Sequence, residues 1–97
     1  MTIGLAYTVR PSSASVCCDL TDEVVILDLS SGDYFGLQEV GSALWHYIQE
    51  PRTVQQVVDH LVSEYDILPE VCEAKTVSFL EDLADHGLIA VDEYAAA

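Results

Sequence analysis

The hydrophobic pattern of this chain changes once, from a strand-like pattern before Gln38 to a helical pattern after it. Before that point, short runs rich in Val, Ile and Leu are separated by polar turns, which is typical of β-strands. After it, apolar residues recur every three or four positions, which is typical of amphipathic helices. A single change of period leaves no alternation of strands and helices, so the sequence predicts an α+β fold rather than a parallel α/β sheet.

The first third of the chain contains four predicted strands. They are Leu5–Arg10, Val16–Leu20, Glu23–Leu29 and Tyr34–Leu37. Pro11 and a serine-rich linker end the first strand, and Thr21-Asp22 forms a polar turn after the second. Residues 30–33, Ser-Ser-Gly-Asp, are a strong hairpin signal because Gly32 can adopt positive φ. We therefore expect an antiparallel sheet of about three strands.

Three helices are predicted to follow and to form a bundle beside the sheet. The first begins near Gln38 and ends before Pro51. The second has a capping box, with Thr53 at the N-cap and Gln56 three residues later. The third begins at Pro69 and runs to about His86, because Pro favours the first helical position and Gly87 suits the C′ position. Residues 88–91 should return as an extended tail, and residues 92–97 should fray.

The charge of the chain excludes two classes of partner. Seventeen acidic residues against three basic ones give a formal net charge of −14. Nucleic-acid phosphates and anionic membranes both bind through Lys and Arg, so neither is an expected partner. The acidity is explained either by solubility or by a partner with a basic surface. The length of 97 residues predicts one domain over residues 1–97, with a core of about 5–91.

No motif in the sequence indicates catalysis, a metal site or a cofactor site. The residues capable of nucleophilic chemistry are Cys17, Cys18, Cys72, His46, His60 and His86. None lies in a recognisable signature, and a buried structural role is the commoner one for free cysteine. The sequence therefore predicts a non-catalytic protein without a metal or cofactor. An odd number of cysteines, with no signal peptide or membrane span, indicates a reducing cytoplasm.

Two segments could form a binding surface instead. The strand Tyr34–Leu37 is aromatic and uncharged, and it lacks the lysine, proline or bulge that usually protects a sheet edge. If it is an edge strand, an extended peptide could pair with it; otherwise the amino-terminal strand covers it. The third helix has a wide apolar arc with a polar border at Lys75, Asp82 and His86. Its Phe79 either lines a groove or packs on a neighbouring helix.

Five segments in order resemble the PqqD-like family. They are the hairpin Leu27–Leu37, the pairs Val40-Gly41 and Leu44-Trp45, the capped helix after Thr53, the stretch Phe79–Leu83 and the segment His86–Ile89. Members of that family are small winged-helix-like domains that recognise the leader peptides of ribosomally synthesised and post-translationally modified peptides. The resemblance covers roughly residues 16–91.

The resemblance implies that a leader peptide adds as a strand beside Tyr34–Leu37 and packs against the third helix. The implied site residues on the strand are Tyr34, Phe35, Gly36 and Leu37. Those on the helix, chosen from its helical wheel, are Cys72, Lys75, Thr76, Phe79, Asp82 and Leu83.

The compact, stand-alone length favours one branch of the family, the leader-binding partner in lasso-peptide biosynthesis. Its implied partners are a transglutaminase-like leader peptidase and an asparagine-synthetase-like cyclase. A peptide chaperone for pyrroloquinoline-quinone maturation, working with a radical-SAM enzyme, is the alternative within the family. A winged-helix DNA-binding regulator and a small thiol enzyme are the alternatives from other classes.

Overall fold

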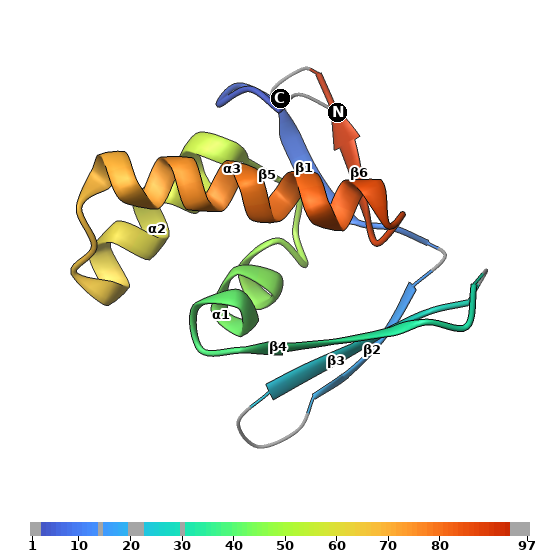
Figure 1. Ribbon diagram of the computed structural model, residues 1–97. Helices are drawn as coiled ribbons and strands as arrows, with labels where there is room; N and C mark the ends of the chain where they lie inside the picture. The colour runs from blue at the N-terminus through green and yellow to red at the C-terminus, as the bar shows by residue number, and fades with distance from the viewer. Residues whose placement is uncertain (1–2, 14, 20–22, 30, 94–97) are drawn as a thin grey trace.

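A computed structural model describes residues 3–13, 15–19, 23–29 and 31–93, and Figure 1 shows their arrangement. The strands are β1 (Thr8–Pro11), β2 (Ser15–Asp19), β3 (Glu23–Asp28), β4 (Tyr34–Gln38), β5 (Arg52–Thr53) and β6 (Ile89–Asp92). The helices are α1 (Val40–Tyr47), α2 (Val54–Tyr65) and α3 (Pro69–Asp85). This order confirms the predicted α+β class. The predicted turn at Thr21-Asp22 and the last residues of the predicted frayed end lie outside the described residues.

Strands β2, β3 and β4 form an antiparallel sheet with β3 in the middle. The register pairs Val24 with Leu37 and Ile26 with Phe35. At the hairpin turn, Gly32 has a φ of 78° and its N–H donates to the carbonyl of Asp28 at 2.8 Å. The hairpin prediction is therefore confirmed, together with the reason for glycine at its turn.

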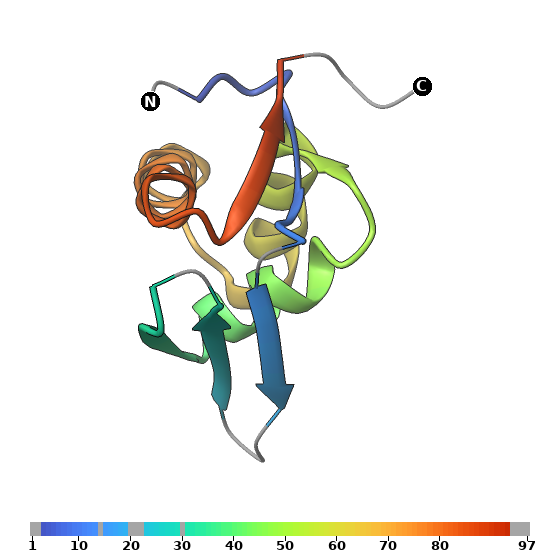
Figure 2. The same ribbon diagram turned by 90° about the vertical axis from the view of Figure 1, so that its right-hand side faces the viewer.

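Strand β1 does not join this sheet. It lies between β5 and β6 in a second antiparallel sheet, where Val9 pairs with Val91. Figure 2 shows the β1–β6 pair apart from the hairpin sheet. The sequence predicted only one sheet, because the partner of β1 lies some eighty residues further along the chain and no local pattern reveals that pairing. As a result, the amino-terminal strand does not cover β4.

The helices follow the predicted pattern closely. The Thr53 hydroxyl accepts from the N–H of Gln56 at 3.1 Å, and the Gln56 side chain accepts from the N–H of Thr53 at 2.9 Å, which confirms the capping box. Pro69 begins α3, and Gly87 follows its end with a φ of 73°. Helix α1 begins at Val40 rather than near Gln38, because Gln38 is still paired with Glu23 in the sheet.

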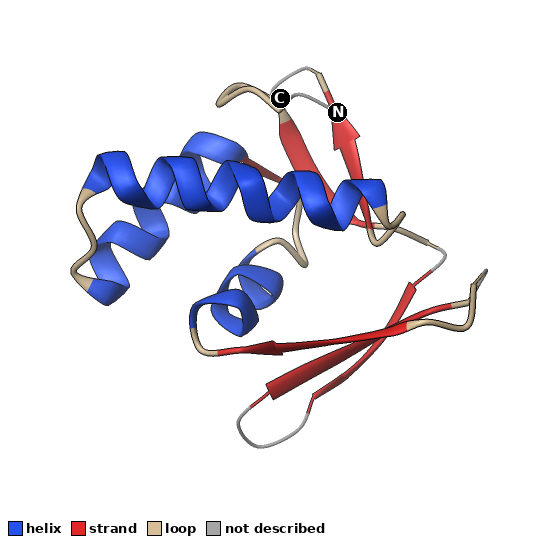
Figure 3. Ribbon diagram, viewed as in Figure 1, coloured by secondary structure: helices blue, strands red, loops and turns tan. Residues whose placement is uncertain are grey.

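One hydrophobic core joins both sheets and all three helices. Its fully buried side chains are Val9, Val24, Ile26, Leu44, Trp45, Ile48, Val54, Val57, Leu61, Leu80 and Leu88. Burying one such side chain contributes about 1.5–3 kcal/mol, so this cluster fixes the hairpin sheet and α3 relative to α1. Figure 3 shows α3 passing over α1 and the hairpin sheet. Within the part of the chain that is described, no helix is long and apolar enough to cross a membrane.

Candidate functional site

Strand β4 forms one edge of the hairpin sheet. Among the described residues it has a strand partner on one side only, which is β3. Its side chains alternate, with Leu37 buried and Phe35 half-buried toward the helices, while Tyr34, Gly36 and Gln38 are exposed. An uncharged edge strand presents a row of backbone donors and acceptors with which an extended peptide can pair.

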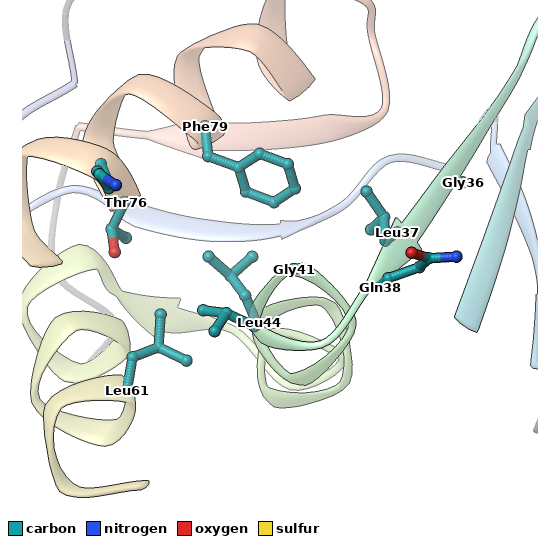
Figure 4. Close-up of a pocket in the computed structure, with 10 residues that line it drawn as sticks. Gly36, Leu37, Gln38, Gly41, Leu44, Leu61, Thr76 and Phe79 are labelled. Carbon is teal, nitrogen blue, oxygen red and sulfur yellow. The ribbon is translucent and has the colours of Figure 1, made fainter. Parts of the chain in front are cut away.

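Two hollows lie side by side between β4 and α3. The first, of about 380 Å³, has an apolar floor that also includes α1 and α2 (Figure 4). It is lined by Gly36, Leu37, Gln38, Val40, Gly41, Leu44, Leu61, Lys75, Thr76 and Phe79. The second, of about 540 Å³, is lined by Tyr34, Phe35, Gly36, Leu37, Phe79, Asp82, Leu83 and His86. Because Gly36, Leu37 and Phe79 line both, the two hollows form one trough, here called the β4–α3 groove.

Phe79 stands at the junction of the two hollows. Its half-buried ring projects from α3 toward the region of Leu37 and Gly41 (Figure 4). A Cβ atom built on Gly41 would lie 3.4 Å from Cζ of Phe79 and 3.7 Å from Cβ of Leu37. The missing side chain at Gly41 therefore leaves room for the ring against α1. Phe79 packs on a neighbouring helix and also lines the groove, so both interpretations of the sequence hold.

Nine of the ten site residues named from the sequence line the groove, and the exception is Cys72. The Cys72 side chain is 3% exposed, and its sulfur lies 3.8 Å from the carbonyl of Val58 and 3.7 Å from the hydroxyl of Thr76. This turn of α3 faces α2, and one apolar arc on a helical wheel does not separate the side facing the core from the side facing a groove. Cys72 therefore lies in the core and does not line the groove.

The structure adds His86 to the second hollow. Its ring lies edge-on to Phe35 with centroids 4.8 Å apart, and its Nδ1 lies 2.8 Å from the carbonyl oxygen of Asp82. The sequence placed His86 in the polar border of α3 but not among the ten site residues. The other lining residues that the site prediction missed are Gln38, Val40, Gly41, Leu44 and Leu61. Val40, Gly41 and Leu44 belong to segments that carry the family resemblance, which was the available signal for them.

Three other residues considered for nucleophilic chemistry, Cys17, His46 and His60, do not line the groove. Cys17 is exposed on β2, and His60 stacks on Tyr47 with ring centroids 4.0 Å apart. Arg52 lies 4.4 Å from the centroid of the Tyr47 ring, so this cluster packs α1 against α2 and β5. No three His, Cys, Asp or Glu side chains in the described ranges are placed to hold a metal ion. The groove itself offers backbone groups and apolar surface, which suits binding of an extended chain.

Comparison with known proteins agrees with this geometry. The sequence model of the coenzyme PQQ synthesis protein D (PqqD) family matches residues 23–89, from the start of β3 to the start of β6. The structure of TbiB1 in complex with the TbiA(beta) leader peptide is similar, with a TM-score of 0.80 and 36% sequence identity over 90% of this chain and 99% of that one.

A second solved structure, a lasso peptide synthetase B1 complexed with the leader peptide, has the same fold. Its TM-score is 0.76 at 20% identity, over 84% of this chain and 96% of that one. No curated protein matches the chain. The family match covers more than half of the residues and includes both walls of the β4–α3 groove. The chain therefore belongs to the PqqD family.

Proposed function

We propose that this protein binds the leader region of a ribosomally synthesised precursor peptide in the β4–α3 groove. The leader adds to β4 as a further antiparallel or parallel strand, and its inward side chains fill the two hollows. One observation carries this proposal: the edge strand β4, free of charged residues, lies across an apolar groove from Phe79. Backbone pairing supplies affinity that is independent of sequence, and the hollows select alternate side chains.

The relatives support the same function. TbiB1 is 36% identical and is seen with a leader peptide, and the lasso peptide synthetase B1 of the same fold is also seen with one. The residues we assign to binding are Tyr34, Phe35, Gly36, Leu37, Lys75, Thr76, Phe79, Asp82 and Leu83, with Gln38, Gly41 and His86 added. We assign them to a single leader-binding domain that comprises the chain.

The role we propose within biosynthesis is delivery rather than catalysis. The bound leader holds the precursor for a leader peptidase and a cyclase, as in lasso-peptide pathways, in the reducing cytoplasm that the free Cys17 and Cys72 suit. The likeness to TbiB1 and the lasso peptide synthetase B1 favours this pathway. The family description, coenzyme PQQ synthesis, keeps delivery to a quinone-forming radical-SAM enzyme as the second candidate. The neighbouring genes distinguish the two, because each pathway requires its own enzymes.

Binding is tested with a fluorescently labelled leader peptide of the cognate precursor. Phe79→Ala should weaken binding by about 1–3 kcal/mol, because Phe79 contributes to both hollows. Val71→Ala is the matched control, since Val71 is 41% exposed on the same helix and lines neither hollow. Equal affinity of the Phe79 and Val71 variants would contradict the proposed site.

Hydrogen exchange tests the mode of binding separately. Amides of β4 should become protected when the leader is added, while those of β2, at the opposite edge of the sheet, should not. Protection confined to β2 would place the peptide at the other edge and overturn the assignment of β4.

A further inference from the structure

We infer that Lys75 and Asp82 place opposite charges in the two hollows of the β4–α3 groove. This arrangement selects peptides that carry an acidic and a basic side chain on opposite sides of an apolar one. This inference rests on the proposed function and goes beyond it, because it specifies the chemistry of the bound segment. It concerns specificity and register, whereas affinity comes mainly from backbone pairing and apolar contact.

Lys75 marks one end of the groove. It is the only lysine of a chain with a net charge of −14, and its exposed side chain lines the first hollow together with Gln38 and Val40. Residues one turn away on α3 are Val71, Cys72, Ser78 and Phe79, none of which is charged. No ion pair joins Lys75 to any other described residue. A peptide carboxylate at this end of the groove would therefore meet a cation that forms no ion pair with the described part of the chain.

Asp82 lies in the other hollow, one turn before His86. It is exposed and lines the second hollow with Tyr34 and Phe35, at the start of β4. Its neighbour Glu81 is engaged elsewhere, because it accepts a hydrogen bond from the N–H of Ile3 at 3.1 Å. Of these two neighbouring acidic residues of α3, Asp82 is thus the one that lies in the groove. A basic peptide side chain fits here and an acidic one is repelled.

A further carboxylate, that of Glu23, lies on the other face of β4. It accepts from the Gln38 amide at 3.4 Å and lies 3.6 Å from the position that a Cβ on Gly36 would take. In the alternation of β4, Gly36 and Gln38 belong to the exposed face, opposite the face on which Phe35 and Leu37 meet the helices, although both border the first hollow. Glu23 therefore meets outward side chains of an added strand, and the polarity of the inward ones is set by α3.

The spacing on α3 predicts a pattern in the peptide. Lys75, Phe79 and Asp82 lie on successive turns, and seven residues of helix cover about 10.5 Å. A strand advances about 3.3 Å per residue, and its inward side chains recur every second residue. The helical distance of about 10.5 Å corresponds to roughly three strand residues, and the nearest spacing that keeps both charged side chains inward is four residues, or about 13 Å. The expected segment is therefore a charged residue, any residue, an apolar residue, any residue and a residue of opposite charge. The apolar residue faces Phe79, and the acidic one lies at the Lys75 end.

The test selects binding peptides from a displayed library of random ten-residue sequences, using the full chain. Peptides that still bind the Phe79→Ala variant are discarded, so that the remaining ones depend on the groove. We expect acidic and basic residues to be enriched four positions apart, on opposite sides of an apolar position. The double variant Lys75→Glu, Asp82→Lys keeps the net charge unchanged and should invert the order of the two charges.

A matched control measures the size of the effect. One exposed ion pair changes affinity by about 1.4-fold to 5-fold, so exchanging both charges of a selected peptide should weaken binding by about fivefold or more at low salt. The difference should shrink as salt is added. Glu73→Lys changes the charge of α3 as Asp82→Lys does, but Glu73 lines a hollow against the amino-terminal segment instead, so this variant should keep the original order.

The outcomes separate this inference from the proposed function. Groove-dependent peptides without a polar order, or uniformly basic ones, would overturn the inference and leave leader binding intact. An order that persists in the double variant would also overturn it. Failure to enrich any peptide that depends on Phe79 would count against the proposed function itself.

Discussion

Gly41 of α1 and Phe79 of α3 meet at the floor of the β4–α3 groove, where a Cβ on Gly41 would lie 3.4 Å from Cζ of the ring. The ring occupies the space that a residue larger than alanine would need at position 41. Leu37 also approaches the same point, at 3.7 Å from that Cβ. The helix that follows β4 and the helix that faces it are thus joined by a contact that requires a very small residue.

The first prediction concerns that contact. Gly41→Leu should reduce leader affinity more than tenfold, because the leucine side chain displaces Phe79 and fills the first hollow. Helix α1 itself should stay formed. Gly41→Ala is the control and should keep most of the affinity, since 3.4 Å is close to ordinary contact distance. Fluorescence anisotropy measures binding and circular dichroism checks the fold. Full affinity in the Leu variant would show that the first hollow is not used.

A second prediction concerns Glu39, which connects β4 to α1. It has a φ of 50° and a ψ of −116°, a conformation that glycine adopts far more readily than residues with a side chain. Glu39→Gly should therefore raise the free energy of unfolding by about 1 kcal/mol, after the greater entropy of the unfolded glycine is subtracted. Gln38→Gly should lower it instead, because Gln38 is an ordinary strand residue. Urea denaturation measures the free energy of unfolding of both variants. A destabilised Glu39→Gly variant would show that the backbone of Glu39 is not strained.

Cys72 tests the separation between core and groove. Cys72→Ala should lower the free energy of unfolding by about 1 kcal/mol, because the side chain is 3% exposed, yet leave leader affinity unchanged. Cys17→Ala, at an exposed position of β2, should change neither quantity. The pair also bears on the thiol-enzyme alternative: loss of precursor processing in either stable variant would revive it.

The DNA-binding alternative predicts a different result. A winged-helix regulator would place a helix against phosphates, but α3 carries one lysine and the acidic residues Glu70, Glu73, Glu81, Asp82 and Asp85. We expect no shift of duplex DNA in a gel at about 50 mM salt, where phosphate contacts are strongest. A shift that weakens steeply with added salt would contradict leader binding as the sole role of α3.

The sequence alone was enough for the local elements and for most of the residues that line the groove. Gly32, the Thr53–Gln56 capping box, Pro69 and Gly87 act within a few residues of themselves, so their signals could be read without a structure. The family resemblance pointed to β4 and α3 as the two sides of the binding site. Nine of the ten residues named from it and from the helical wheel line that groove, and these include Phe79.

Other features depended on the tertiary structure. Whether β4 is an edge strand was decided by β1, which pairs with β6 from the far end of the chain and leaves β4 without a second partner among the described residues. The two sides of α3 were separated by its neighbours, since α2 covers Cys72 while the side facing β4 keeps Phe79 half-exposed. Local propensity depends on adjacent residues, but strand pairing and burial depend on residues that only folding brings together.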